Sequence, residues 1–488
     1  MTDVTLDKSS KDSSPPADFR FEINRTLALP LTDQICAAIR TAIRQGALAP
    51  GARLPSWQDL SAQLGVARGT VRAAYYRLTD EGLIASLGAA GTHVAHSPTQ
   101  ASPATADRFA DLRSSLDLFG AGPPGIFQMG VPAHDAFPAK LWARLHRRAA
   151  DAGALRTRYL DPRGIDALRH QIAAHLALAR GLQCTPGQVF ITTSFRGALG
   201  LVLQALPSAR RRAWVEDPGY PVSRHGLELA GFSPVPVAVD GQGIDVGLGI
   251  ALARDAGLAV VTPGQQAPLG HTLSPERRQA LLAWARESDA WIIEDDYLSE
   301  LHLDGRAAPA LAASDTDGRV IHIGTFSKTI SPLLGIGFLV APEALIAPLM
   351  RVATYLAPPP NYAAQAALAE FLADGHYLRH LRRMKLLYRK RREAVLDALQ
   401  AAGSVRAAGL AVHVPLARET DDVWLVGRLR EEGFAPTALS QWYGSQAPEK
   451  GLVIGITNAA PETLPGDAAR LLLLVREDVR PAPQSRGA

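Results

Sequence analysis

The sequence predicts two modules: a small helical module that ends in a β-hairpin, and a much larger α/β domain with a mainly parallel sheet. Two observations support this division. Residues 31–78 carry apolar side chains at helical spacing, whereas from residue 116 onward short β-rich runs alternate with helical runs. At about 150 residues per domain, the 488 residues correspond to about three domains, which is long enough for a large core and a second module.

The composition is that of a soluble globular protein, with 47% hydrophobic and 20% charged residues. No apolar run reaches the roughly 18 residues of a membrane span, and the N-terminus lacks the apolar core of a secretory signal. Only Cys36 and Cys184 are present, which excludes a disulfide framework and a cysteine-rich zinc site. We therefore expect a cytoplasmic protein with no membrane partner and no metal; the net charge of +4 only mildly favours a polyanionic partner.

The first module, residues 21–96, has the element order of a winged helix-turn-helix. A first helix is expected from Leu31, where apolar residues recur at helical spacing. Ser56 and Asp59 form a capping box that opens a second helix, and a third helix begins near Arg68. The run LIASLGAAGTHVA then predicts two short strands around a glycine-rich tip. This succession is typical of a DNA-binding wing and helix pair.

The module contains arginine but no lysine. The planar guanidinium group of arginine can donate two hydrogen bonds at once to a guanine edge or a phosphate. Arg68 and Arg72 lie one turn apart at the start of the third helix, the end that enters the major groove. Charge runs are usually solvated helix faces, but this topology favours contact with a double-stranded DNA operator. The residues expected to contact DNA are Arg68, Thr70, Arg72, Gly91 at the wing tip (residues 88–91) and Arg53.

Composition also marks the ends of the two modules. Residues 1–20 are polar and rich in Ser and Pro, and we expect a disordered tail. Residues 97–118 are rich in Pro, Ala, Ser and Thr and predict a linker. The second domain then covers residues 119–486, with a large lobe at about 150–345 and a small α/β lobe at about 346–486.

Two β-rich runs of the large lobe, AWIIEDDY and VIHIGTF, end in polar residues and are joined by a short helical crossover. These residues are Asp295, Asp296 and Tyr297 after the first run and Thr325, Ser327 and Lys328 after the second. Carboxyl ends of neighbouring parallel strands meet at one edge of a sheet. A lysine amine, an acid and hydroxyl donors are what pyridoxal phosphate requires of a protein. A lone lysine is more often solvated, but the spacing of Asp295 and Lys328 fits one strand, a crossover and the next strand.

The first module resembles the DNA-binding domain of GntR-type bacterial regulators. The resemblance rests on the P-G-x-x-L-P-S turn, the L-G-V-x-R-x-T-V core and the G-x-x-G-T wing. By this resemblance Arg68, Thr70 and Arg72 would be the operator-contacting positions. Gln58 stands where the family often has a basic residue early in the second helix.

The second domain, from about residue 130, resembles fold-type I aminotransferases, and the pair of domains looks like the MocR/GabR-like regulators. Four motifs carry this resemblance in order: YLDPRG, VEDPGYP, IIEDDY and GTFSK. Each motif alone is weak, whereas four in order and spacing are strong. The resemblance implies a mainly parallel seven-stranded sheet, a pyridoxal 5'-phosphate site and a homodimer.

The resemblance also implies a role for individual residues of the cofactor site. Lys328 would form the Schiff base, Asp295 (with Asp296 as its competitor) would hold the pyridine nitrogen, Tyr297 would bond the phenolate oxygen and Tyr220 would cover the ring. Phosphate donors would be Thr325, Ser327 and the segment with Ser194, Phe195 and Arg196, ahead of a helix. Tyr159 would reach into the site of the partner subunit.

Three departures from the family pattern concern binding of ligands. Gly335 stands where members carry a phosphate-binding arginine, seven residues after Lys328, and Arg196 is the candidate to replace its charge. Gln265 stands at a histidine position. No small-lobe arginine that would grip a substrate carboxylate is evident, and Lys450 is the nearest cation.

These observations predict a ligand-responsive transcriptional regulator that senses pyridoxal phosphate or its aldimine with an amine or amino acid, and that is not primarily an enzyme. Two alternatives stay open: an active aminotransferase, and a regulator whose aminotransferase-like domain has lost the cofactor. The missing carboxylate grip and the DNA-binding module argue against the first alternative, and Gly335 keeps the second open.

Overall fold

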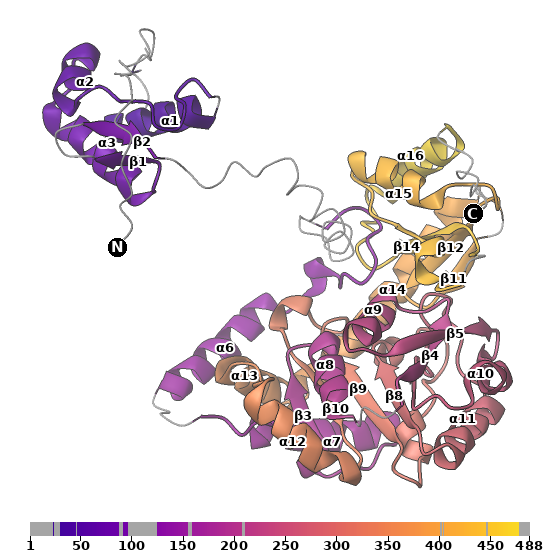
Figure 1. Cartoon of the computed structure of the whole chain (residues 1–488). Helices are drawn as coiled ribbons and strands as arrows, with labels where there is room; N and C mark the ends of the chain where they lie inside the picture. Colours follow the sequence, from indigo (N-terminus) through magenta and orange to yellow (C-terminus); the bar gives the residue numbers. More distant parts are fainter. Residues whose placement is uncertain are drawn as a thin grey trace, which may run out of the picture. The chain divides into compact units, whose positions relative to one another are not determined.

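The protein, described here from a computed structural model, divides into two compact units, Met1–Ala121 and Gly122–Ala488 (Figure 1). The structure describes residues 23, 30–44, 46–86, 91–95, 124–154, 159–206, 210–400, 403, 405–445 and 448–477. The predicted tail, the predicted linker and most of the predicted wing tip lie outside these residues.

The first unit has the helix order and the small antiparallel wing that the sequence predicts. Its elements are α1 (Leu31–Arg44), α2 (Trp57–Leu64), α3 (Arg68–Asp80), β1 (Ile84–Ser86) and β2 (Thr92–Val94). The Ser56 hydroxyl caps α2 by accepting from the Asp59 amide at 3.1 Å, and Gly65 ends the helix with a φ of 62°. Val71 and Leu78 of α3 are fully buried against Ile35 and other apolar residues of α1 and α2.

The large lobe of the second unit is built on a mixed, mainly parallel sheet in the order β3-β10-β9-β8-β7-β4-β5-β6. The strands are β3 (Val189–Thr192), β4 (Arg212–Asp217), β5 (Ser233–Asp240), β6 (Gly243–Ile244), β7 (Leu258–Val261), β8 (Trp291–Asp296), β9 (Val320–Thr325) and β10 (Gly337–Val340). β10 runs antiparallel to both of its neighbours. The described sheet has eight strands instead of seven, because a turn at residues 241–242 brings β6, which begins at Gly243 (φ 96°), back along β5.

Helices cover both faces of this sheet (Figure 1). They are α6 (Ala139–Ala154), α7 (Asp166–Arg180), α8 (Phe195–Ala205), α9 (Pro221–Leu229), α10 (Val246–Ala253), α11 (Pro275–Glu287), α12 (Glu343–Tyr355) and α13 (Tyr362–Ala373). Ile293 of β8 packs with the α8 and α12 side, whereas its neighbour Ile292 packs with α10 and α11. Successive residues of one strand therefore belong to different cores, as the pleat of a strand requires.

The small lobe is an antiparallel sheet in the order β11-β12-β14-β13, covered by helices. Its elements are β11 (Arg406–Ala408), β12 (Ala411–Pro415), α15 (Asp422–Glu431), β13 (Thr437–Ala438), β14 (Gly451–Gly455) and α16 (Leu464–Glu477). The long helix α14 (His376–Leu399) joins the lobes: Tyr377 packs in the large lobe, and α16 and β12 pack against the helix. Helices α12 and α13, which a division near residue 345 would place in the small lobe, pack against α8 and α6.

Short 3-10 segments complete the described part of the chain. They are η2 (His134–Ala136), η3 (Pro186–Gln188), η4 (Ser299–Leu301), η5 (Leu311–Ser314), η6 (Pro332–Leu334) and η8 (Leu439–Trp442). The crossover from β8 to β9 is thus helical only through η4 and η5. Among the described helices, none combines the length and the apolar character that a membrane span needs.

Candidate functional site

The start of α3 presents two arginines to solvent. Arg68 and Arg72 are exposed on consecutive turns, and in the described part of the first unit neither forms an ion pair. Two other arginines of the unit are occupied instead, since Arg40 pairs with Glu81 and Arg77 pairs with Asp33, each at 2.6 Å. The structure thus separates arginines that are available for phosphate or base contacts from arginines that tie α1 to α3.

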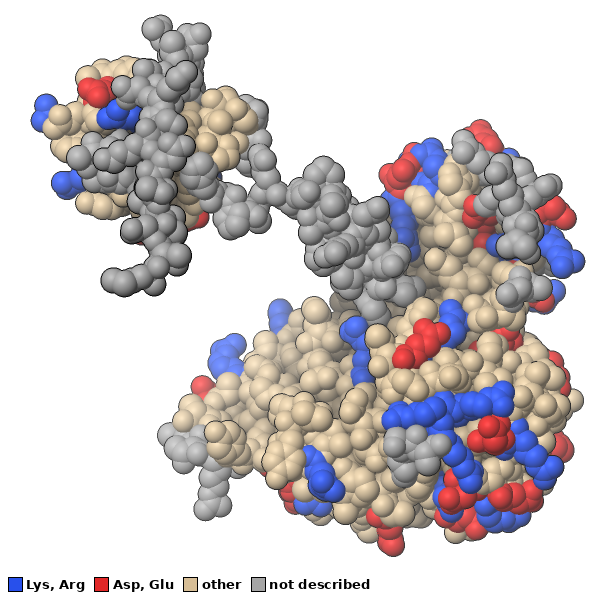
Figure 2. All heavy atoms as spheres, in the orientation of Figure 1, with Lys and Arg blue, Asp and Glu red and all other residues tan. Residues whose placement is uncertain are grey.

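The wing places two further predicted DNA contacts beside each other. Arg53 bridges to His93 of β2, and a Cβ at Gly91 would lie 3.1 Å from the Arg53 Nε atom. Gly91 has a φ of 93°, which favours glycine. Thr70 is half-buried in the first turn of α3. On the visible face of the second unit, Lys and Arg gather over one side of the large lobe, where Asp and Glu lie among them (Figure 2).

Lys328 and Asp295 form the centre of the site in the second unit. The Lys328 Nζ atom donates to the Gly130 carbonyl at 2.9 Å. Burial lowers the pKa of this amine, Asp295 opposes the shift, and Arg196 adds to it. Asp295 is only 5% exposed, and its Oδ1 atom has no hydrogen-bond partner among the described residues. Burial raises its pKa well above the usual range, helped by the Asp296 and Glu216 carboxyl groups.

Asp296 belongs to the opposite face of the sheet. Its Oδ2 atom accepts from Arg180 Nε at 2.7 Å, and the two side chains are 5% and 1% exposed. His322, on the neighbouring strand β9, lies 3.6 Å from the same oxygen and 3.0 Å from Glu294. Because side chains alternate along a strand, Glu294 and Asp296 share this buried network while Asp295 points the other way. The geometry therefore favours Asp295 over its competitor as the acid beside Lys328.

Two tyrosines adjoin the Asp295 carboxyl group. Burial raises the pKa of Tyr220 to about 12, with Asp295 adding to the shift. Burial also raises the pKa of Tyr297, again with a contribution from Asp295. The Tyr220 ring lies between Phe195 and Trp442, with centroid separations of 6.1 Å to each. Trp442 comes from the small lobe, so the Tyr220 side of the site joins both lobes.

The N-terminus of α8 forms a cup of potential anion donors. The Ser194 hydroxyl caps the helix by accepting from the Gly197 amide at 3.3 Å. Phe195 is 8% exposed and its ring packs in the core, so only its backbone remains for a ligand. Arg196 is exposed at the second helix position and acts electrostatically on Lys328 and Tyr220. Backbone amides at a helix start, next to a cation, suit a phosphate.

The end of β9 adds two hydroxyl groups, and a glycine borders the cup. Thr325 Oγ1 lies 3.0 Å from Ser327 Oγ and accepts from the Ser327 amide at 3.1 Å. Gly335 ends η6 with a φ of 59°, and a Cβ there would lie 3.9 Å from the Thr193 carbonyl oxygen. Position 335 thus borders the α8 cup without contributing a cation to it.

Three other predicted positions have the following surroundings. The Lys450 amine pairs with Asp422 at 3.1 Å. This lysine is the cation that the sequence analysis named as the nearest candidate to bind a substrate carboxylate, and its charge is already paired. Gln265 packs on the small-lobe backbone, because a Cβ at Gly409 would meet its Nε2 atom at 1.8 Å. Tyr159 is fully exposed on the second unit.

Two residues near the site were missed by sequence reasoning. Glu216 accepts from the Thr262 amide and hydroxyl, and burial raises its pKa to about 7 despite these hydrogen bonds. It stands inside the VEDPGYP motif, so the motif was the available signal. Gly130, 198 positions away from Lys328, carries no signal in the sequence.

These residues fit pyridoxal phosphate. A buried carboxyl group with a raised pKa and a free oxygen suits a basic ring nitrogen. An amine with a lowered pKa is a ready nucleophile toward an aldehyde. Among the described residues, no group of three or more His, Cys, Asp or Glu side chains could hold a metal ion. The buried acid, the nearby amine and the donors at the start of α8 suit an organic, anionic ligand.

Comparisons with known proteins agree with both units. Residues 31–94 match the family of bacterial regulatory proteins of the gntR type, and residues 127–441 match the aminotransferase class I and II family. The chain is 33% identical to the pyridoxine biosynthesis transcriptional regulator PdxR of Corynebacterium glutamicum, over 92% of this chain and 96% of that protein. It is 32% identical to the probable rhizopine catabolism regulatory protein MocR of Rhizobium meliloti, over 91% and 93%.

Solved structures resemble the second unit. An archaeal alanine:glyoxylate aminotransferase superposes with a TM-score of 0.69 at 24% identity, over 76% of this chain and 95% of that chain. The α-aminoadipate aminotransferase LysN of Thermus thermophilus, solved with N-(5'-phosphopyridoxyl)-L-leucine, gives 0.65 at 25% identity, over 78% and 98%. The second unit therefore has the fold of class I and II aminotransferases.

Proposed function

Because the chain belongs to the MocR-type family of helix-turn-helix transcriptional regulators with an aminotransferase-like domain, we propose that its second unit is a sensor that binds pyridoxal phosphate. The observation that carries the proposal is the buried Asp295 carboxyl group, unpartnered at Oδ1, on the side of the sheet that faces Lys328. The effector is the cofactor itself or an amine or amino acid that reacts with it.

Each residue of the site has a proposed task. Pyridoxal phosphate, when bound, supplies an aldehyde for a lysine amine and a ring that withdraws electrons. Lys328 provides that amine, and burial keeps it readily deprotonated. Asp295 holds a proton shared with the ring nitrogen, Tyr297 donates to the ring oxygen, and Tyr220 covers one ring face.

The phosphate is proposed to occupy the α8 cup. Ser194, Thr325 and Ser327 offer hydroxyl groups there, and the first amides of α8 offer backbone donors. Arg196 supplies the cation that position 335 lacks. Its exposure and its electrostatic action on Lys328 support this role.

The first unit is proposed to read an operator through α3 and the wing. Arg68 and Arg72 face the major groove, Thr70 contacts phosphate, and Arg53 and Gly91 approach the backbone from the wing. Tyr159, fully exposed, is proposed to reach a second copy of this chain. A dimer would then present two reading heads to paired half-sites in the cytoplasm.

We propose a sensing role in preference to catalysis. Lys450 is held by Asp422, so it offers no free charge to a substrate carboxylate. Release of an oxo acid from an amino donor, in step with conversion of bound cofactor to its amine form, would instead support an aminotransferase.

One spectroscopic experiment tests the cofactor proposal. Purified full-length protein is titrated with pyridoxal phosphate and the visible absorbance of a protonated Schiff base is followed. Wild type is expected to develop the band and Lys328→Ala to lack it. A wild-type spectrum identical to that of free pyridoxal phosphate would leave a regulator whose sensor has lost the cofactor.

A further inference from the structure

A segment of the second unit, residues 124–137, links Lys328 to the small lobe, and we name it the strap. It is the first described segment of the unit and follows the connection from the DNA-binding unit in the sequence. Near the middle of the strap, Gly130 accepts the hydrogen bond from Lys328 Nζ at 2.9 Å. The strap therefore contacts the reactive amine directly.

The first half of the strap is held by the small lobe. The Ile126 amide donates to the Gly433 carbonyl at 3.0 Å, and the Gly455 amide donates to the Phe127 carbonyl at 2.8 Å. Phe127 is fully buried and its ring stacks on Phe434, with centroids 6.1 Å apart. This half of the strap is thus fixed to small-lobe backbone just after α15, at Gly433, and at the end of β14, at Gly455.

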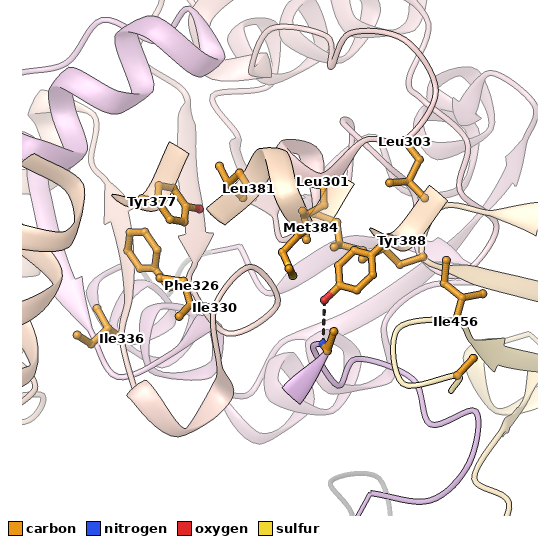
Figure 3. Packing of buried hydrophobic residues seen from close by; sticks show 14 of the residues in the cluster. Leu301, Leu303, Phe326, Ile330, Ile336, Tyr377, Leu381, Met384, Tyr388 and Ile456 are labelled. Carbon is orange, nitrogen blue, oxygen red and sulfur yellow. Dashed lines mark hydrogen bonds between the residues drawn. The ribbon is translucent and has the colours of Figure 1, made fainter. Parts of the chain in front are cut away.

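The second half of the strap is held by α14 and its neighbourhood. The Tyr388 hydroxyl accepts from the Ala133 amide at 2.9 Å, the dashed line in Figure 3. Arg391 donates to Asp135 at 2.7 Å, and Thr457 donates to the Val131 carbonyl. Both ends of the strap are therefore anchored, and Gly130 lies between the anchors against the amine.

Gly130 approaches Lys328 closely. A Cβ at this position would lie 2.4 Å from Nζ, and the residue has a φ of 74°. The positive φ favours glycine at this position. A chemical change that removes N–H groups from the Lys328 amine therefore alters its hydrogen bond to the Gly130 carbonyl.

The same face of α14 also contacts the loop that carries Lys328. The Tyr377 hydroxyl lies 3.2 Å from Thr329 Oγ1, and His380 Nε2 lies 2.8 Å from the Thr329 carbonyl oxygen. Phe326 and Ile330 pack in the core around this helix (Figure 3). α14 thereby fixes the Lys328 loop at one end and the strap further along.

From these contacts we propose that the order of the strap depends on whether the Lys328 amine is free or condensed with an aldehyde. Gly130 and Tyr388 are the residues that position the strap. The free amine donates to Gly130 and restrains the strap. Condensation with an aldehyde forms a carbon–nitrogen double bond and releases water, so the nitrogen keeps at most one N–H. The nitrogen thereby loses at least one of the N–H groups that can face Gly130, so its hydrogen bond to the Gly130 carbonyl is weakened and the strap loosens. This step rests on the proposed function of Lys328.

Hydrogen–deuterium exchange of the full-length protein tests this inference on the peptide that covers the strap. Lys328→Met keeps the apolar stem and removes the donor, so exchange in the strap is expected to rise about tenfold without any ligand, as for one lost hydrogen bond. Tyr388→Phe is expected to give a similar rise. Tyr355→Phe is the control, because it removes an exposed tyrosine hydroxyl from α12, outside both the strap and the Lys328 loop.

Added pyridoxal phosphate separates this inference from the proposed function. Strap exchange in wild type is expected to rise toward that of Lys328→Met as the visible band appears, and the variant is expected not to change further. Unaltered strap exchange in ligand-free Lys328→Met would overturn the inference even if wild type shows the band. If strap exchange rises in Lys328→Met but wild type shows no Schiff-base absorbance, the contact between Lys328 and the strap is supported and the cofactor is refuted as its trigger.

Discussion

The adjacent carboxylates Asp295 and Asp296 should respond in opposite ways to the same substitution. Asp296 forms a buried pair with Arg180, and the two side chains are 5% and 1% exposed. Asp296→Asn removes the charge and leaves the guanidinium uncompensated in the core, which costs about 3–5 kcal/mol. Asp295 has an unpartnered Oδ1 and a pKa raised mainly by burial, so Asp295→Asn removes no comparable interaction.

The expected shifts in melting temperature follow from the size of the second unit. An unfolding entropy of about 2.1 cal/mol/K per residue gives about 0.8 kcal/mol/K for a unit of this length. The loss in Asp296→Asn then lowers the melting temperature by about 4–6 °C, whereas Asp295→Asn stays within about 1 °C. Differential scanning calorimetry of ligand-free protein measures both shifts, with the transition of the first unit resolved separately.

Binding should show the reverse order. Asp295→Asn is expected to weaken pyridoxal phosphate far more than Asp296→Asn, because only Asp295 faces Lys328. The reasoning fails if Asp295→Asn is the destabilised variant, or if Asp296→Asn melts with wild type and loses the cofactor.

Three further predictions concern other residues. Arg196→Gln removes the only cation assigned to the phosphate cup, and a lost charge-assisted hydrogen bond of about 1.5–3 kcal/mol should weaken pyridoxal phosphate by about 10- to 150-fold in an absorbance titration; an unchanged Kd would exclude the role. Burial lowers the pKa of Lys328 below 10.5, so the rate at which the visible band forms should rise with pH and level off before pH 10.5. A rate that still rises at pH 10.5 would contradict this prediction. Arg68→Ala and Arg72→Ala should each reduce the salt dependence of DNA binding by about one phosphate contact, while Arg77→Ala, paired with Asp33, should not; equal slopes for all three would refute the assignment.

The sequence predicted helix ends and strands correctly where the local residue pattern alone determines them. Ser56 and Gly65 bound α2 as capping chemistry requires, and the run IIEDDY became β8 with its polar residues at the carboxyl end. The strands expected from apolar runs are present for the same reason, since buried parallel strands read as continuous hydrophobic segments. In such places one stretch of chain holds all the information.

The rest depended on contacts between distant segments. Which of Asp295 and Asp296 faces Lys328 is decided by strand parity and by Arg180, which lies on α7. The Gly130 contact joins residues 198 positions apart. Lys450 is neutralised by Asp422, a pairing that follows from packing of the small lobe. No periodicity or motif records such pairings.

The most direct test of the account is the coupling between Lys328 and DNA. A binding site is first selected from random DNA with full-length protein, and its Kd is then measured by fluorescence anisotropy with and without pyridoxal phosphate at fixed salt. The account predicts that the cofactor changes the Kd of wild type by at least about fivefold and leaves that of Lys328→Ala unchanged. An equal Kd in all four measurements, or the same shift in both proteins, would contradict it.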